Sequence, residues 1–476
     1  MRRSTLLFPL LLTALCAASA LAQTPAPLPA NPTADAVDPT PGCAGFCDTD
    51  RISRPSRLGR GVQFGVQLQN LVVLRSDTDF DPTAPAWNPD GQTSGAHATV
   101  LQPTITWHAA RDLRIYYETE VGLNYWSKSD PNQEDMTAPS AFMLKQRQIF
   151  AEGELGDEDD WGFRVGYQYL SDPTGLFLGH WLGAAGLWHQ IDGDLRVGLV
   201  AGQVPDATYE GLTIQDNNFR HDIFVGGLRA DLGMAAQDRI SAGVYGLYDN
   251  SEIGRPRWLV APAVHVRGDM GVLSGSLDGV LQVGSSANTA AGGGDQTILA
   301  WAAQAHGDMD LAPFALSLNV LALSGDDGYS GNDREGAFLS SSRSSSRTVM
   351  LTEDEHRNWY DQLDRRMARF QSGFWQHDAG FAVADLTAAM QIGEGFRPAL
   401  ILGGAAVLEP KHALNERWTG FEADVDLGFR TGESLTAHLV GSVLLPGKAA
   451  AALVNRIDLA STEPIWSMSA TVGVGY

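Results

Sequence analysis

The fold is decided by the last eleven residues of the chain, Trp466 to Tyr476, which read WSMSATVGVGY. Successive side chains of a β-strand point to opposite sides, so alternate residues share a face. One face of this stretch is apolar and aromatic, and the other carries only serine, threonine and glycine. The stretch is therefore predicted to be a strand with one apolar face and one small, polar face.

A bare edge strand at the end of a chain is a hazard that soluble proteins usually avoid. The stretch instead resembles the closing strand of a bacterial outer-membrane β-barrel, whose final aromatic residue helps the assembly machinery to recognise the chain. Tyr476 would be that residue. An ordinary amphipathic edge strand is the alternative interpretation. The resemblance implies a location in the outer membrane of a Gram-negative bacterium.

The chain divides into three regions by composition. Residues 1–22 are predicted to be a secretory signal peptide, because two arginines precede an apolar run that ends in a small-x-small cleavage site. Residues 23–60 are rich in Pro, Ala, Asp and Thr and are predicted to be a flexible periplasmic segment. Residues 61–476 would form the barrel. They contain no apolar run of the ~20 residues that a membrane-spanning helix needs.

The barrel region repeats one pattern, in which apolar and polar residues alternate over segments separated by Gly, Asp, Asn and Pro. A transmembrane strand needs ~9–11 residues and shows this alternation. The clearest segments are 113–125, 161–169, 421–430 and 434–445. Weaker candidates are 61–75, 98–109, 142–155, 176–190, 194–203, 222–233, 237–249, 255–268, 270–284, 296–308, 311–323, 377–392 and 396–408.

The predicted fold class is all-β: a transmembrane antiparallel β-barrel of about 18 strands, with 16 as the alternative count, and one long, partly helical loop. A soluble β-sandwich also alternates, but its strands are usually shorter. A barrel of this size encloses water unless something fills it. The short joins 109–111 and 431–433 would face the periplasm, and the longer joins would face outward.

One connection, residues 325–374, is too long to be a turn. Thr352 and Glu355 resemble a capping box, and apolar residues from Trp359 to Phe370 follow at helical spacing. Long loops in compact folds are usually functional or disordered, so we expect this one to fold over or into the pore as a constriction or lid. A mobile surface loop is the alternative. The candidate constriction residues are Arg357, Arg365, Arg366 and Arg369.

The same loop opens with the acidic residues Asp326, Asp327 and Asp333. Hard cations take several carboxylate oxygens, so these residues are weak candidates for calcium. No EF-hand spacing is present, and no metal site is predicted. No cofactor is predicted either.

Selectivity in such a pore comes from its width and from charged side chains on its inner face. Arginine keeps its charge at any physiological pH and pairs bidentately with carboxylates, so inward arginines are predicted to guide acidic groups. The alternative is that they form wall-to-wall salt bridges with Glu118, Glu120, Asp231 and Asp278. Tyr116 and Tyr245 are candidates for stacking on sugar faces, and plain packing, the commoner role of a tyrosine in a barrel, is the alternative. The candidate lumen residues are Arg114, Tyr116, Glu118, Arg164, Arg196, Arg229, Arg267, Glu422, Asp424 and Asp426.

A second resemblance concerns the stretch from Gly420 to Gly447, in which a Gly-x-Glu-x-Asp strand is followed by a turn, a strand and a Pro-Gly loop. This stretch resembles the penultimate strand pair of the alginate-export family of outer-membrane porins, and residues 216–231 and 324–326 are loosely similar to that family. The resemblance implies an 18-stranded barrel that carries an acidic polysaccharide outward through a lumen lined with cations.

The charge of the chain departs from that family pattern. Its formal net charge is −23, and Glu422, Asp424 and Asp426 form an acidic ladder. A neutral or mixed exopolysaccharide is therefore as compatible as an anionic one. The implied partners are outer-membrane lipid, the polysaccharide cargo and a possible periplasmic export partner. Nucleic acid is excluded, because phosphate binding needs a basic face.

Enzyme motifs are missing from the sequence. The 11 histidines show no His-Glu-x-x-His spacing, and no Gly-x-Ser-x-Gly elbow appears, so no catalytic residue is predicted. The leading hypothesis is a passive outer-membrane conduit for a secreted exopolysaccharide. A general diffusion porin for small solutes is the alternative. A barrel lipid hydrolase, with His438 beside Ser442 as the remnant of its site, is the third hypothesis.

Overall fold

The computed structural model describes residues 61–75, 94–110, 112–126, 140–155, 161–191, 194–204, 223–233, 239–250, 256–287, 295–327, 334–341, 347–348, 351, 369–371, 374–432, 434–453 and 464–475. All of them belong to one compact unit, residues 42–476. The predicted signal peptide and the periplasmic segment lie outside the described residues. Within the described ranges, no helix has the length and apolarity needed to cross a membrane.

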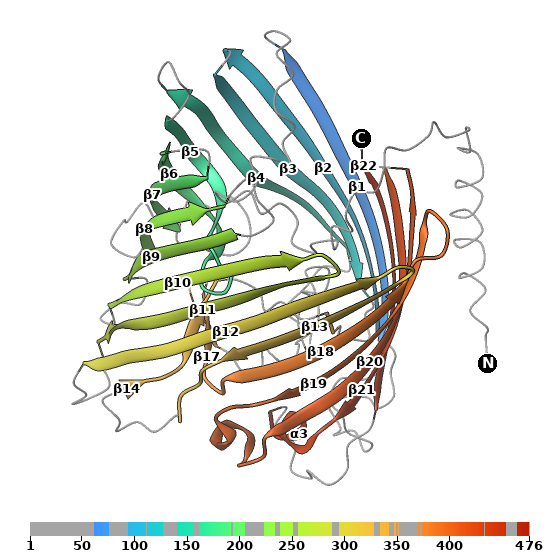
Figure 1. Cartoon of the computed structure of the whole chain (residues 1–476). Coiled ribbons are helices and arrows are strands. Elements are labelled where there is room, and N and C mark those ends of the chain that lie inside the picture. The colour runs from blue at the N-terminus through green and yellow to red at the C-terminus, as the bar shows by residue number, and fades with distance from the viewer. Residues whose placement is uncertain are drawn as a thin grey trace. The chain divides into compact units, whose positions relative to one another are not determined.

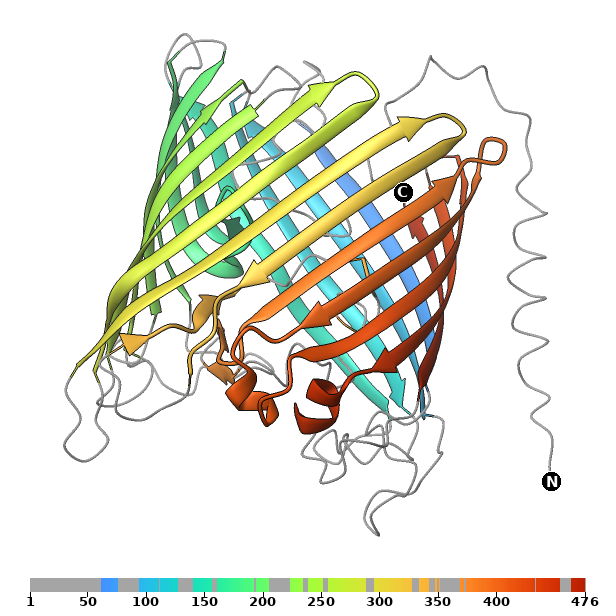
Figure 2. The same cartoon turned by 60° about the horizontal axis from the view of Figure 1, so that its bottom comes forward.

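Eighteen antiparallel strands form one closed sheet (Figures 1 and 2), so the predicted fold class is confirmed with the larger of the two strand counts. Each strand pairs with its sequence neighbour around the ring, and β1 pairs with β22 to close it. The strands are β1 (Val62–Arg75), β2 (Ser94–Ala110), β3 (Leu113–Trp126), β4 (Ser140–Leu155), β5 (Trp161–Ser171), β6 (Gly179–Gln190), β7 (Leu195–Val204), β8 (Ile223–Leu232), β9 (Arg239–Asp249), β10 (Arg257–Met270), β11 (Leu273–Ser286), β12 (Gln296–Leu311), β13 (Phe314–Leu323), β18 (Phe381–Met390), β19 (Phe396–Ala406), β20 (Trp418–Thr431), β21 (Leu435–Pro446) and β22 (Ile465–Gly475).

The last strand closes the barrel, as its sequence predicts. Leu68 of β1 lies opposite Val474 of β22, and nine residue pairs join the two strands. A closed ring has no free edge strand, and an open sheet edge is not tolerated in lipid. The alternative of an ordinary edge strand is therefore wrong.

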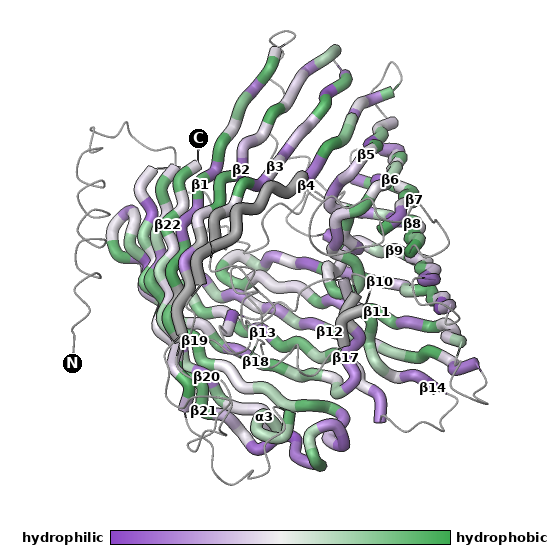
Figure 3. The backbone as a smooth tube through the Cα atoms, turned by 180° about the vertical axis from the view of Figure 1, so that it is seen from behind, coloured by the Kyte–Doolittle hydropathy of each residue, from purple (hydrophilic) through white to green (hydrophobic). Residues whose placement is uncertain are grey.

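The two faces of the sheet differ in the way that the alternation predicts. On β12 and β13, Trp301 and Leu318 face outward and are 44% and 52% exposed, whereas the neighbouring Ala302 and Asn319 face inward and are buried. Figure 3 shows this alternation of apolar and polar residues along the strands. Large apolar side chains on the outer face of a closed barrel suit contact with lipid.

The connections also differ at the two ends of the barrel. Short turns join β2 to β3, β10 to β11, β12 to β13 and β20 to β21, and this end is called the short-turn end. Longer connections lie at the opposite, long-loop end. In outer-membrane barrels the short turns are periplasmic and the long loops extracellular, and both termini of the barrel domain lie at the short-turn end. The predicted short joins at 109–111 and 431–433 are confirmed.

Smaller elements come from the long-loop end. A three-stranded sheet consists of β15 (Phe338–Ser340), β17 (Phe374–His377) and β16 (Arg369–Gln371), in that order. The two-residue strand β14 (Arg334–Glu335) pairs in parallel with β12. A 3-10 turn η4 (Pro410–Ala413) and a short helix α3 (Lys448–Leu453) follow later in the chain.

Two predicted strand boundaries are wrong in the same way. The strand predicted at 176–190 begins at Gly179, and the strand predicted at 377–392 begins at Phe381. The apolar residues Leu176 to Leu178 precede β6 as a loop and are fully or almost fully buried. An apolar run shows that residues are buried, but it does not show whether a strand or a folded-in loop buries them.

Candidate functional site

The predicted lumen residues all lie on the inner face of the barrel. Along each strand they share a face with side chains that bond to loops inside the ring, as Glu422 does. Most of them are shielded from solvent. Arg164, Arg229, Glu422 and Asp424 are each less than 7% exposed. Arg267 is the exception, since it is exposed. The alternation therefore places these residues correctly, and their partners decide what they can do.

A carboxylate shared by two arginines occupies the wall formed by β3, β4 and β5. The Nη2 atoms of Arg114 and Arg164 both lie 2.9 Å from Oε2 of Glu152. The guanidinium of Arg164 also lies 4.6 Å from the centre of the Phe150 ring. This supports wall-to-wall pairing for these arginines, although their partner is Glu152 and not one of the four carboxylates expected. Paired charges of this kind stiffen the wall.

The two tyrosines that were expected to stack on sugars are engaged elsewhere. The Tyr116 ring stacks on Phe150 at 5.1 Å, and its hydroxyl donates to Glu118 at 3.0 Å. Tyr245 is 1% exposed, and a Cβ added at Gly227 would lie 2.4 Å from its ring. Packing is therefore the correct interpretation for Tyr245, because its ring fills the space left by a glycine on the next strand.

Four arginines crowd the inner face of β7 to β10 near the short-turn end, and we call this group the basic wall. Arg229 and Arg239 both bond to Asp231, at 2.8 Å and 3.1 Å. Arg196 donates to the Gln190 side chain at 3.2 Å. Arg267 lies opposite Arg239 in the register of β9 and β10 and has no ion-pair partner within the described ranges. Asp231 thus pairs with two of these four arginines, so the five residues together carry net positive charge.

An acidic wall lies on the far side of the ring. Its members are Asp385 on β18 and Glu422, Asp424 and Asp426 on β20, of which the first three are less than 3% exposed. Going round the barrel, β20 is eight strands from β8, and nine would be diametrically opposite. The Nδ1 atom of His438 lies 3.1 Å from Oδ1 of Asp426. The inner face therefore carries a group of acidic side chains on one side and a group of arginines on the other.

Parts of the long loop lie inside the barrel, at Leu339 and at Leu351. The Leu339 backbone exchanges two hydrogen bonds with the side chain of Gln282 on β11, at 2.6 Å and 3.0 Å. Farther along, the Leu351 amide donates to Glu422 on the acidic wall at 2.7 Å. Both wall residues face inward and are fully buried. The expectation that this loop enters the pore is confirmed for these parts, and the mobile surface loop is wrong for them.

A buried carboxylate fixes another part of the same loop. Glu335 accepts a hydrogen bond from Ser286 at 2.8 Å and lies 3.5 Å from Arg257. It also accepts from the side-chain amide of Gln376 on β17. Glu335 is 7% exposed, and buried charges are tolerated when they are paired and hydrogen-bonded. The three-stranded sheet is thereby tied to β10 and β11.

A second loop meets the long loop inside the barrel, and sequence reasoning missed it. The amide of Ser341 donates to the Phe177 carbonyl at 2.9 Å, and Ser340 bonds to the carbonyl of Leu176. Asp172 organises this loop by accepting hydrogen bonds from the amides of Thr174, Phe177 and Leu178. Gly175 follows with φ +66, a conformation that glycine adopts without strain. The Asp-Pro-Thr-Gly sequence at 172–175 was the available signal, since it is typical of a turn.

Burial changes the ionisation of two groups on these loops. Burial lowers the pKa of His377, on β17, to about 4, and its Nδ1 atom has no hydrogen-bond partner within the described part of the chain. Burial raises the pKa of Asp172, against the effect of the hydrogen bonds that its carboxylate accepts. His377 is therefore neutral at neutral pH, which suits its position in a closely packed sheet.

Other loop predictions are tested only in part. Residues 352–368, with Arg357, Arg365 and Arg366, lie outside the described residues. Arg369 and Phe370 belong to strand β16, so a helix that reaches Phe370 is wrong at that residue. Pairing with β17 overrides the local helical spacing there.

The calcium candidates have other partners. Asp326 accepts a hydrogen bond from the Gly336 amide at 3.2 Å, and Asp327 lies 3.0 Å from the Lys411 ammonium. Asp333 lies outside the described residues. Across the described ranges, no group of three or more acidic, histidine or cysteine side chains is placed to hold a metal ion.

The remnant of a hydrolase site is ruled out by geometry. His438 and Ser442 share the inner face of β21, but a strand rises ~3.3 Å per residue, so four residues separate them by roughly 13 Å. A proton cannot pass directly between them. His438 contacts Asp426 instead.

Comparison with known proteins gives matches by structure alone. No protein-family model and no curated protein sequence matches the chain. The crystal structure of Pseudomonas aeruginosa OccK9 (OpdG) aligns with a TM-score of 0.52 at 12% identity, covering 87% of this chain and 98% of that one. Acinetobacter baumannii OccAB4 aligns with a TM-score of 0.50 at 10% identity, covering 88% and 99%. The outer membrane protein opdK from Pseudomonas aeruginosa aligns with a TM-score of 0.49 at 10% identity, covering 87% and 99%.

At such identities the first two matches show a shared fold, and they do not single out the alginate-export family. The closed ring of eighteen strands, its apolar outer face and its charged inner face agree with them. The chain therefore has the fold of an outer-membrane β-barrel porin.

Proposed function

We propose that the protein is a passive channel for small water-soluble solutes across the outer membrane. One observation carries the proposal: two loops are bonded to each other and to the inner wall, so that they narrow an eighteen-stranded lumen. A barrel of this size without such loops would hold a wide aqueous pore. Width and charge at the narrowed part then select the solute.

The walls of opposite charge suggest which solutes pass. The basic wall attracts anions, and its Arg267 is exposed and lacks an ion-pair partner among the described residues. The acidic wall repels the same anions from the opposite side. We therefore propose that small anions travel along the basic wall, with Arg267 as the residue that they meet first from the short-turn end.

Exopolysaccharide export, which the family resemblance implies, remains the second candidate, and the interior of the barrel argues against it. A polymer chain would need the loop at Glu335, Leu339 and Leu351 to leave the wall, and buried hydrogen bonds hold it there. The cargo polysaccharide and the periplasmic export partner belong to this second candidate. Deletion of the gene distinguishes the two: export leaves polymer in the periplasm, whereas the channel loses uptake of small solutes.

Ion selectivity tests the leading proposal. In planar bilayers with a salt gradient, Arg267→Gln should shift the reversal potential toward cation selectivity, because it removes the unpaired charge of the basic wall. Arg417→Gln removes the same charge at the long-loop end, where the side chain bonds to the Leu408 carbonyl, and serves as the matched control. Liposome swelling with sugars of increasing size should show a cut-off at small solutes. Equal reversal potentials for the wild type and both variants would contradict the role of the basic wall.

A further inference from the structure

The barrel wall is not hydrogen-bonded along its whole height between β4 and β5. Their ladder runs from the pair Leu155 and Trp161 to the pair Ile149 and Tyr167. Beyond Ile149, β4 continues for nine residues to Ser140 and stays paired with β3, and β5 continues to Ser171 and stays paired with β6. The described residues form no further pair between β4 and β5 there. Figure 1 shows these two strands diverging from each other.

Side chains connect the two strands where the ladder ends, and we call residues 140–148 with residues 168–171 the seam. The Gln148 side chain accepts a hydrogen bond from the backbone amide of Tyr169 at 3.3 Å, in place of a carbonyl of β4. Arg147 donates from Nε to Glu120 at 2.6 Å, and its guanidinium lies 4.7 Å from the centre of the Trp181 ring on β6. Arg147 thus spans from β3 to β6.

These contacts make the seam easier to open than the rest of the wall. In the hydrocarbon layer each backbone polar group needs a partner, so a continuous ladder opens only by breaking many hydrogen bonds together. At the seam, the described contact between the two strands is made by a side chain, which can rotate without breaking a backbone ladder. The seam lies toward the long-loop end, which is the outer leaflet when the short turns are periplasmic.

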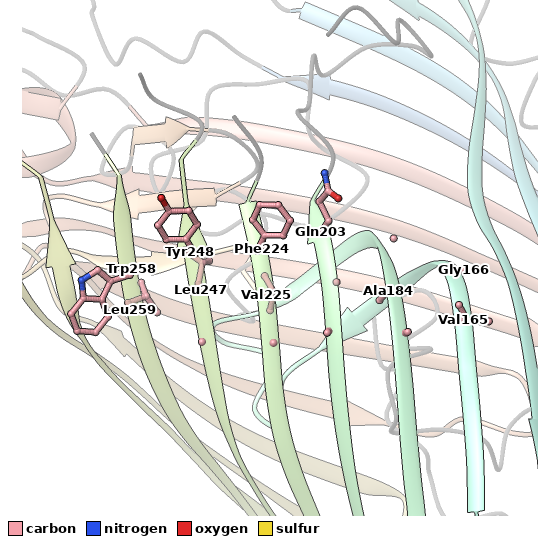
Figure 4. A pocket seen from close by; sticks show the side chains of 16 residues that line it. Val165, Gly166, Ala184, Gln203, Phe224, Val225, Leu247, Tyr248, Trp258 and Leu259 are labelled. Atoms are coloured by element: carbon pink, nitrogen blue, oxygen red, sulfur yellow. The ribbon is translucent and has the colours of Figure 1, made fainter. Parts of the chain in front are cut away.

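Both sides of the seam offer apolar surface. Inside, Leu170, Phe177, Leu178 and Leu182 are buried in one apolar cluster. Outside, a shallow groove of about 870 Å³ begins at Val165 on β5 and extends across the outer face to β10. Its floor is made of small residues, namely Gly183, Ala185, Ala201, Gly226 and Gly246. Figure 4 shows Phe224, Tyr248 and Trp258 in a row along one rim of the groove.

We propose that the seam opens as a lateral portal, through which apolar or amphiphilic small molecules pass between the lumen and the outer leaflet. Such a molecule moves from the apolar cluster inside to the groove outside, and on the way it passes the polar side chains of Arg147, Gln148 and Gln168. This activity goes beyond the proposed axial channel, because water-soluble solutes have no reason to leave the lumen into lipid. The axial path and the portal share the same barrel and can be measured separately.

A reversible cross-link tests the portal. The pair Gln148→Cys and Gln168→Cys follows the last ladder pair and would close the seam, whereas Ala151→Cys with Val165→Cys adds a disulfide inside the existing ladder as the control. Both pairs are made with Cys43 and Cys47 replaced by serine. In intact cells, uptake of the hydrophobic dye N-phenyl-1-naphthylamine reports the portal, and hydrolysis of nitrocefin by a periplasmic β-lactamase reports the axial path.

The portal predicts that the oxidised seam pair lowers dye uptake to the level of cells without the protein, that reduction restores it, and that nitrocefin hydrolysis is unchanged. The control pair should alter neither rate. Arg147→Met should raise dye uptake about tenfold, the effect of losing one charge-assisted hydrogen bond, while Arg417→Met should not. Unchanged nitrocefin hydrolysis shows that these variants are folded.

Two results would overturn the portal. One is dye uptake that does not depend on the seam disulfide. The other is a second protein chain cross-linked to a single cysteine at Gln148, which would make the seam a protein interface. Failure of the proposed axial channel gives a different result. Nitrocefin hydrolysis would then be the same in cells with and without the protein, independently of the rate of dye uptake.

Discussion

Substitution of Gln282 by methionine should release the long loop from the inner wall. The Gln282 amide donates to the Leu339 carbonyl and accepts from the Leu339 amide, and these residues are 0% and 4% exposed. Methionine keeps the length of the side chain but offers neither partner. A buried backbone group left without a partner costs about 1–3 kcal/mol, so the two groups together cost about 2–6 kcal/mol. Even the lower figure reduces the docking equilibrium about thirtyfold.

Single-channel recording measures this release directly. We expect Gln282→Met to spend more time in a state of higher conductance and to show more current noise than the wild type. Gln304→Met is the matched control, because Gln304 also faces the lumen from the next strand and its side chain donates to Asn319 on β13. Identical conductance histograms for the wild type and both variants would refute the idea that the docked loop narrows the pore.

Three further predictions concern the lipid face, acid pH and the second loop. Leu318→Arg should destabilise the folded barrel by about 2–4 kcal/mol in lipid, because Leu318 is 52% exposed on the outer face; a measured loss below 1 kcal/mol in reversible unfolding would contradict membrane contact there. His377 has a pKa of about 4 when buried and 6.5 otherwise, so the undocked form binds the proton more readily. Docking of β15 to β17 should therefore weaken as pH falls from 6.5 to 4. Hydrogen exchange of these strands, corrected for intrinsic rates, should speed up over that window, and it should not do so in His377→Leu. Asp172→Ala removes the acceptor of three backbone amides, so we expect more current noise from the loop that carries Phe177, and wild-type noise would contradict its place in the constriction.

Much of the fold could be predicted from the sequence because the signal is local. A membrane strand must alternate between lipid and lumen at every second residue, so each strand can be recognised without knowledge of its neighbours. All eighteen strands and the inward position of Arg114, Arg164 and Glu422 follow from that rule. The strand starts predicted at 176 and 377 were wrong, because a loop that folds into the barrel also buries its apolar residues although it is not part of the barrel strand.

The partners of the site residues could not be predicted in this way. Arg114 lies 38 residues from Glu152 in the sequence, and Gln282 lies 57 residues from Leu339. Which carboxylate pairs with which arginine depends on strand register and on the β-bulge in β4. The alternation of apolar and polar residues predicts neither of them. That Arg267 has no ion-pair partner among the described residues is likewise a result of what its neighbours bind.

The sequence by itself predicted the closed barrel and the direction in which each wall residue points, and it narrowed the number of strands to 16 or 18, because a two-residue period is a property of single strands in contact with lipid. Only the tertiary structure decided which charges are neutralised, how two loops meet inside the ring and where the ladder between β4 and β5 ends. Those features depend on atoms that come from distant parts of the chain and are brought together by closure of the ring.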